Sequence, residues 1–255
     1  MQLFFSFGNS IANPHYYKNL KALSKGKAIG YAFFLAFLMT ASAAVINYYE
    51  KNGFKNFVES FKKEAPDFVL EKGELKVEGK QPLRFDTEEG PVIIDTTGQT
   101  PVTALDDLDS GVLILKDQFI HKRNKFKTEH VNLKEIPIRV DKQAVIGWFP
   151  SLYALITFFS YFAHVFYVFF AALLVSLTGL LIKLFKKAPL SFGDLYKLSI
   201  YTLTTSFLVW LVLRFFSIHI PLVVWILIST FILAKAIQVI SEDNPPRSED
   251  PALSP

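Results

Sequence analysis

The residue best placed to do chemistry is His164, which lies within the uncharged stretch from Gln143 to Ile182. At helical spacing it shares a face with four other polar side chains, namely Thr157, Ser160, Tyr161 and Tyr167. A polar group at this depth usually faces protein, and an imidazole there can relay protons. A relay normally uses a carboxylate partner, however, and none of the long apolar stretches contains Asp or Glu. We therefore expect His164 to form a hydrogen bond between helices.

A second polar group lies in the apolar stretch from Leu198 to Leu213. Its members are Tyr201, Thr202, Thr204, Thr205 and Ser206. So many hydroxyl groups indicate packing against neighbouring helices, and they could also line a small cavity. The candidate intramembrane polar site combines both groups and consists of His164, Tyr161, Ser160, Tyr201 and Thr205.

A loop motif with the sequence Asp-Thr-Thr-Gly runs from Asp95 to Gly98. Aspartic proteases need a single Thr in such a loop and a second carboxylate of the same kind, and phosphorylated pumps need a Lys. Neither reaction fits this chain. A short Asp side chain at the end of a strand often bonds the backbone two residues on, so we expect an Asx turn at Asp95.

Residue types argue against most other chemistry. The chain has no Cys, which excludes disulfides, thiolate catalysis and Cys-based metal sites. The five histidines lack metal-binding spacing, and Asp106, Asp107 and Asp109 lack the alternating ligands and distal Glu of a calcium loop. No nucleotide loop, catalytic triad, haem signature or quinone signature is present. We expect no catalytic residue, no metal, no cofactor and no enzymatic activity.

The segment from Ser191 to Lys197 leads into the third apolar stretch. We expect an interfacial turn in which Gly193 supplies the bend and Asp194 starts the helix. Lys197 is expected to snorkel from the end of that helix toward the membrane surface.

Long apolar segments dominate the chain, which is 51% hydrophobic with a mean hydropathy of +0.30. A membrane-spanning helix needs about 20 apolar residues. The expected order is a cytoplasmic N-terminal segment (1–27), spans at 28–49, 150–184, 198–216 and 221–239, an extracytoplasmic domain (50–142), a cytoplasmic linker (185–197) and a disordered cytoplasmic tail (241–255). The fold class is an α-helical polytopic membrane bundle of about four transmembrane helices with an inserted β-rich α+β extracytoplasmic domain.

Lysines set the expected orientation. One cluster precedes the first span and another follows the second, and the positive-inside rule places both in the cytoplasm. This requires an odd number of crossings between them, which one long helix from Pro150 to Leu184 satisfies; two crossings over 143–184 remain the alternative. A cleaved signal peptide ending at Ala43 is the alternative to an uncleaved first span.

The expected extracytoplasmic domain begins with an amphipathic helix from Lys51 to Glu64, which Pro66 ends. Short β patterns follow. We expect a hairpin that turns at Lys72–Glu74, strands at Pro82–Asp86 and Val92–Asp95, an alternating strand from Val112 toward Ile120, and a weaker strand region at Val131–Val140.

Several motifs occur in an order that resembles one bacterial family. They are Asn13–Tyr17, Gly26–Ala28, Phe61–Phe68, Lys72–Leu75, Ile93–Gly98 (with Asp95 and Gly98) and Leu190–Leu198 (with Ser191, Phe192, Gly193 and Asp194). The chain resembles the domain of unknown function 1189 family, uncharacterised four-span membrane proteins often labelled maltodextrin utilization protein. The entry to the third span is also faintly similar to the Yip1-like group. The resemblance implies a multi-pass cell-membrane protein, with no established reaction.

Two functions follow from this organisation. The preferred one is an accessory, sensing or scaffolding protein that acts through its outer domain and a membrane-protein partner or a second copy. The alternative is a component of a transporter for a carbohydrate or another neutral solute. The lipid bilayer is an expected partner, nucleic acid is not, and the ligand is left open.

Overall fold

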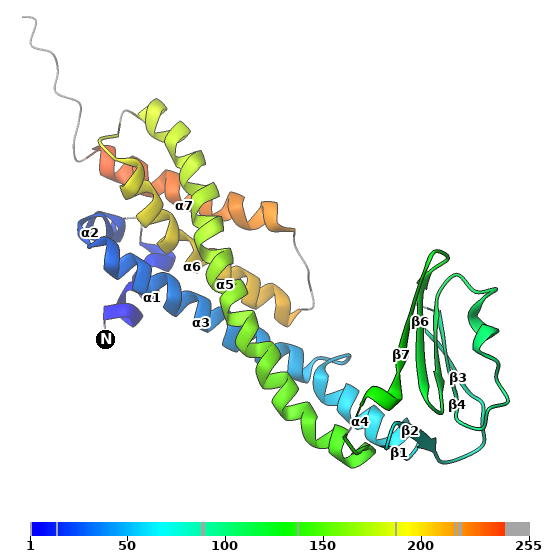
Figure 1. Ribbon diagram of the computed structural model, residues 1–255. Coiled ribbons are helices and arrows are strands. Elements are labelled where there is room, and N and C mark those ends of the chain that lie inside the picture. The colour runs from blue at the N-terminus through cyan, green and yellow to red at the C-terminus, as the bar shows by residue number, and fades with distance from the viewer. Residues whose placement is uncertain are drawn as a thin grey trace, which may run out of the picture. The chain divides into compact units, whose positions relative to one another are not determined.

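The computed structural model describes residues 2–13, 15–87, 90–136, 138–186, 188–216, 218 and 221–242. The chain divides into two compact units, which Figure 1 shows as a group of long helices and a group of strands. We call Met1–Tyr48 with Leu155–Pro255 the helical unit, and Tyr49–Ala154 the β unit.

Four helices are long and apolar enough to cross a membrane. The apolar stretches of the sequence lie in α3 (Lys25–Tyr49), α5 (Lys142–Lys186), α6 (Phe192–Phe215) and α7 (Leu222–Glu242). α5 is one continuous helix of 45 residues with Pro150 inside it, so its length is about 68 Å at 1.5 Å per residue. Within the described residues this stretch has no turn at which a second crossing could begin.

α6 is the central helix of the helical unit. Its apolar window is 61% buried, against 33% or less in the other three long helices. α7 packs along α6, and α7 also approaches α5 closely at Gly179, where an added Cβ would lie 2.7 Å from Leu233 Cδ2. The greater burial explains why α6 tolerates more hydroxyl groups than a lipid-facing helix would.

The N-terminal segment is more ordered than the sequence indicates. It forms α1 (Gln2–Ala12) and α2 (Tyr16–Ala22), and both pack against α6. Tyr17 and Leu20 of α2 are fully buried in the core of the helical unit. Of the tail expected at 241–255, Ser241 and Glu242 end α7, and 243–255 lie outside the described residues.

The β unit contains two sheets. The three-stranded sheet has the order β2-β1-β8 and the five-stranded sheet has the order β3-β4-β5-β6-β7. Their bounds are β1 Phe68–Glu71, β2 Glu74–Val77, β3 Leu83–Thr87, β4 Gly90–Asp95, β5 Gly111–Leu115, β6 Gln118–Asn124, β7 Lys127–Asn132 and β8 Val140–Asp141. Only the β4–β5 pair is parallel among the strands that the structure describes, and the 3₁₀ helix η1 (Val102–Leu105) lies in its crossover.

Most of the expected elements of the β unit are present. The hairpin of β1 and β2 is confirmed, and it turns at Lys72 (φ 53°) and Gly73 (φ 79°). Two consecutive left-handed residues match the twist of antiparallel strands. The amphipathic helix is also confirmed as α4 (Phe54–Glu64), which packs its Phe face against Phe149 of α5.

Two strand predictions are wrong in detail. The alternating segment from Val112 to Ile120 is not one strand, because the chain reverses at Lys116 and Asp117 between the antiparallel strands β5 and β6. The region from Val131 to Val140 is also interrupted: β7 ends at Asn132, and the 3₁₀ helix η2 (Leu133–Glu135) follows. The Lys134 N–H donates to the Asn132 side chain, and the Ile136 N–H donates to the Leu133 carbonyl. These local turns replace strand pairing in η2.

Candidate functional site

His164 makes the interhelical hydrogen bond expected from its position. Its Nδ1 lies 3.0 Å from Thr40 Oγ1 of α3, and Thr40 also donates to the Ala36 carbonyl at 2.8 Å. The imidazole is further hydrogen-bonded to the Ser160 backbone, one turn earlier in α5. These contacts hold the ring between α3 and α5 without a carboxylate. They account for His164 as a structural residue that joins the two helices.

A hollow of about 290 Å³ opens beside His164. It is lined by Met39, His164, Tyr167, Phe207, Trp210, Leu222 and Trp225. The lining is mainly apolar and aromatic, with His164 as its titratable group of lowest intrinsic pKa. The hollow can accept a small neutral molecule, and it offers no charge partner for an ionic one.

Tyr201 and Thr205 belong to a different cluster. The Tyr201 ring lies against Tyr31 of α3, with the ring centroids 4.4 Å apart, and the Tyr31 hydroxyl is 2.5 Å from Thr204 Oγ1. Thr205 donates to the Ile11 carbonyl of α1 at 3.4 Å. Among the described residues, neither Tyr201 nor Thr205 hydrogen-bonds His164. The residues of the expected polar site therefore lie in two separate clusters, because α1 and α3 pack against the side of α6 that carries Tyr201 and Thr205.

Ser160 and Tyr161 lie on the α5 side of this division. Both are half-buried, and the Tyr161 ring packs edge-on against Phe162 with centroids 5.7 Å apart. Tyr161 also contacts the core of the helical unit. Of these two residues, Ser160 reaches His164 directly, through its backbone.

The turn before α6 is built differently from the prediction. Ser191 is the N-cap: its hydroxyl accepts from the Asp194 N–H at 3.1 Å, and the Asp194 carboxylate accepts from the Ser191 N–H at 3.1 Å. This reciprocal capping box starts the helix at Phe192, so Gly193 lies in the first helical turn and does not supply a bend.

Lys197 does not snorkel to the surface. It is 8% exposed, and its Nζ donates to the carbonyls of Lys21 and, at 2.9 Å, Leu23. Those carbonyls end α2 and have no partner within that helix. Asp194 Oδ1 completes the site 3.6 Å from Nζ. Lys197 therefore fixes α2 to α6, and no sequence signal besides its spacing from Asp194 identifies this role.

In the β unit, Asp95 forms the expected Asx turn and more. Its carboxylate accepts from the Thr97 N–H at 2.8 Å, the Thr97 hydroxyl at 2.6 Å and the Thr100 N–H at 2.6 Å. Asp95 is fully buried, which by itself raises its pKa, but the hydrogen bonds from Thr100 and Thr97 outweigh burial and hold the pKa well below its usual range. Gly98 turns the loop with φ +85°. This motif closes a loop, and it presents no free carboxylate for catalysis.

Another buried lysine, Lys122 of β6, supports the crossover between β4 and β5. Its Nζ donates to the carbonyls of Leu105 and Asp106 at 3.0 and 2.8 Å, at the end of η1. Leu105 packs with Leu113, Leu115 and Ile120 in the core of this sheet. Lys122 was not identified from the sequence. The alternation of polar and apolar residues along a strand cannot distinguish a lysine that bonds the end of a helix from an exposed lysine.

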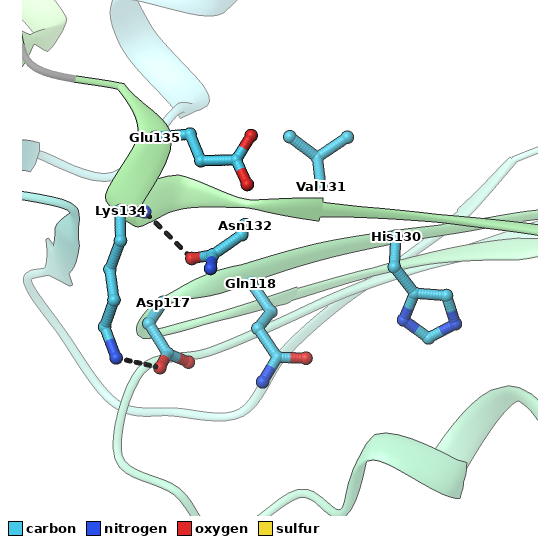
Figure 2. Close-up of a pocket in the computed structure, with 7 residues that line it drawn as sticks. All are labelled: Asp117, Gln118, His130, Val131, Asn132, Lys134 and Glu135. Atoms are coloured by element: carbon cyan, nitrogen blue, oxygen red, sulfur yellow. Dashed lines mark hydrogen bonds and ion pairs between the residues drawn. The ribbon is translucent and has the colours of Figure 1, made fainter.

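A polar groove of about 500 Å³ lies at the end of the five-stranded sheet. Figure 2 shows its seven lining residues, Asp117, Gln118, His130, Val131, Asn132, Lys134 and Glu135. Gln118 and His130 point to one side of the sheet, whereas Val131 and Glu135 lie on the other side of β7 (Figure 2). We call this hollow the β7 groove. Sequence reasoning missed it, because its lining combines the turn before β6 with the end of β7 and with η2.

The β7 groove is lined by two carboxylates, those of Asp117 and Glu135, and by one lysine, Lys134. Lys134 Nζ pairs with Asp117 at 3.3 Å, and the Asn132 side chain accepts the Lys134 N–H at 3.0 Å. Among the described residues, the side chains of Gln118, His130 and Glu135 hydrogen-bond no other residue. The Gln118 amide and the His130 imidazole are therefore free to bind a polar molecule on one side of the sheet, and the Glu135 carboxylate is free on the other side of β7.

Residues 4–237 match the model of a protein family described as "Protein of unknown function (DUF1189)". No curated protein and no solved structure matches the chain. The maltodextrin label and the Yip1-like similarity receive no support from these comparisons.

Proposed function

The chain belongs to the DUF1189 family, and from this premise we propose that it is a multi-pass cell-membrane protein that acts as a non-enzymatic accessory or sensing protein. Its β unit lies outside the cell and binds a polar partner in the β7 groove. Its helical unit crosses the membrane four times and associates with another membrane protein or a second copy.

Two lysine clusters support this orientation. Lys21 Nζ donates to the Pro189 carbonyl at 3.3 Å, and Lys197 donates to the Lys21 carbonyl. The end of α2 therefore lies beside the segment that follows α5, and the lysines of both regions gather at one end of the helical unit. The positive-inside rule places that end, with both termini, in the cytoplasm.

The observation that carries the proposed function is the β7 groove, a polar hollow with unused hydrogen-bonding groups. The neighbouring edge of the sheet argues against a different mode, strand addition. Glu129 of β7 is paired with Arg123 and Lys127 at 3.4 and 3.2 Å, and charged edge strands disfavour pairing with another strand. The groove is lined by several polar side chains, and this favours a polar partner surface.

Site-specific photocrosslinking tests this proposal. A benzoylphenylalanine at Val131, which is 45% exposed in the groove, is expected to give a discrete crosslinked product in native membranes. The same probe at Lys76, exposed on β2 in the other sheet, is the matched control. Equal crosslinking at both positions, or none at Val131, would show that the β7 groove has no specific partner.

The hollow beside His164 favours the second candidate, a component of a transporter for a carbohydrate or another neutral solute. It is intramembrane in the proposed topology, and its lining suits a neutral molecule. Four spans are few for a carrier, so this function requires an oligomer. If a deletion strain took up labelled maltodextrin as well as the parent strain does, the maltodextrin label of the family would no longer favour this alternative.

A further inference from the structure

An apolar hollow of about 230 Å³ lies between the beginnings of α3 and α6. Ile29 contributes from α3, Ile200 from α6, and Lys25 lies at the charged end of the lining. An ideal Cβ on Gly193 would lie 4.0 Å from Lys25 Cε and 3.8 Å from Ser191 Oγ. The missing side chain at Gly193 therefore keeps this α3–α6 groove open beside Lys25.

A second hollow, of about 390 Å³, lies on the other side of the start of α6. We call it the α5–α6 groove, and Phe166, Phe170 and Leu173 of α5 line it. Phe192 and Tyr196 line both grooves and form the ridge between them, with ring centroids 6.4 Å apart.

The ridge presents apolar rings to both grooves. The Tyr196 hydroxyl donates to the Phe169 carbonyl at 3.2 Å, so its polar atom is used within the helical unit. Phe166 and Phe170 stack with centroids 5.8 Å apart and are 70% and 44% exposed. Both grooves are consequently suited to hydrocarbon.

The sequence around the starts of α3 and α6 is rich in lysine. Residues 15–29 contain no acidic residue, and residues 180–200 contain Asp194 alone. Asp194 is committed to Ser191 and Lys197. Lys25 forms no ion pair with any residue that the structure describes, so its ammonium group is available to an anion at the groove.

We propose that the paired grooves bind one anionic phospholipid of the cytoplasmic leaflet. Its phosphate contacts Lys25, and its two acyl chains lie in the α3–α6 and α5–α6 grooves on either side of Phe192 and Tyr196. Basic sites between helices at the cytoplasmic face recognise anionic headgroups by this combination of charge and apolar surface. The inference rests on the proposed membrane insertion.

The charge complementarity distinguishes this occupant from others. A zwitterionic lipid carries the same phosphate, but its headgroup cation offsets the attraction to this lysine-rich end, so we expect it to be held more weakly. Free inorganic phosphate shares the chemistry of the headgroup, but it has no acyl chains to fill the two apolar grooves. If the ligand is a lipid, its binding should therefore depend both on Lys25 and on the two apolar grooves.

Native mass spectrometry of the full-length, delipidated protein in detergent tests the proposal, with phosphatidylglycerol and phosphatidylcholine of identical chains as probes. We expect one phosphatidylglycerol to be retained at least five-fold more strongly than phosphatidylcholine. Lys25→Gln should remove this preference, and Gly193→Leu should remove binding of both lipids at this site. Lys27→Gln, which removes an equal charge on α3 outside the groove, should bind like the wild type.

Gly193→Leu meets no atom closer than 3.8 Å at its Cβ and replaces a poor helix former with a good one, so the protein should fold. Ile29→Trp fills the same groove from α3 and provides an independent variant. Equal retention of both lipids by the wild type, unchanged binding in both groove-filling variants, or displacement of the lipid by millimolar phosphate would overturn the proposal. Failure of membrane insertion would be seen separately, as protein in the soluble fraction.

Discussion

Replacing Lys197 by methionine is expected to loosen the packing of α2 on α6. Methionine keeps the volume but removes the cation that joins Asp194 to the terminal carbonyls of α2. Removing one partner of a buried, hydrogen-bonded charge typically costs several kcal/mol, and since Asp194 is 26% exposed we expect about 2–4 kcal/mol. For a chain of this size that corresponds to a fall in Tm of roughly 5–15 °C.

Two measurements check this expectation on the detergent-solubilised protein. Thermal unfolding should show the lower Tm, and limited trypsin digestion should cut at Lys21, which is protected while α2 is packed. Lys27→Met is the matched control, because it removes one exposed lysine from the same end. If Lys197→Met left both the Tm and the digestion pattern unchanged, Lys197 would not be what holds α2 to α6.

Replacing Asp95 by asparagine should have the largest effect in the β unit. Asparagine keeps one acceptor oxygen but places an amide nitrogen, a donor, against one of the donors now held by the carboxylate. A buried donor without an acceptor costs about 1–3 kcal/mol, and the lost charge weakens the remaining bonds. We expect a loss of about 2–4 kcal/mol of unfolding free energy, seen as faster hydrogen exchange in the segment from Asp95 to Gly111.

The same carboxylate predicts a dependence on pH. Its folded pKa lies below the unfolded value of about 3.9, so its contribution to stability is complete above about pH 5 and declines as the pH falls further. Thermal unfolding of the wild type between pH 5 and pH 2.5 should show this decline, and the decline should be smaller in Asp95→Asn. Asp107→Asn, an exposed carboxylate in the same crossover, is the control. Identical pH profiles for the wild type and Asp95→Asn would contradict the proposed role.

Local patterns predicted the elements that local forces build. The long apolar runs became α3, α5, α6 and α7, and the Phe residues at helical spacing became the packed face of α4. The turn at Lys72 and Gly73 was predictable, because β patterns flank it on both sides and glycine accepts the left-handed conformation. The reversal at Lys116 and Asp117 was missed, although two adjacent polar residues do interrupt the alternation there.

The parts of the candidate sites that failed depend on distant residues. Lys197 looks like a snorkelling lysine until the end of α2, far away in the sequence, is placed beside it. Tyr201 and Thr205 were grouped with His164 because all lie in apolar helices, but α1 and α3 take up the face of α6 that carries them. The β7 groove combines the start of β6 with the end of β7, and no single segment carries that pattern.

The most direct test of the central claim, four spans with the β unit outside, uses cysteine labelling. The chain has no cysteine of its own, so single cysteines at Lys76 and Lys186 can each be read without background. Both positions are exposed. In intact cells, Lys76→Cys should react with a membrane-impermeant maleimide, and Lys186→Cys should react only after the membrane is permeabilised. Labelling of Lys186→Cys from outside, or protection of Lys76→Cys until permeabilisation, would contradict the proposed topology.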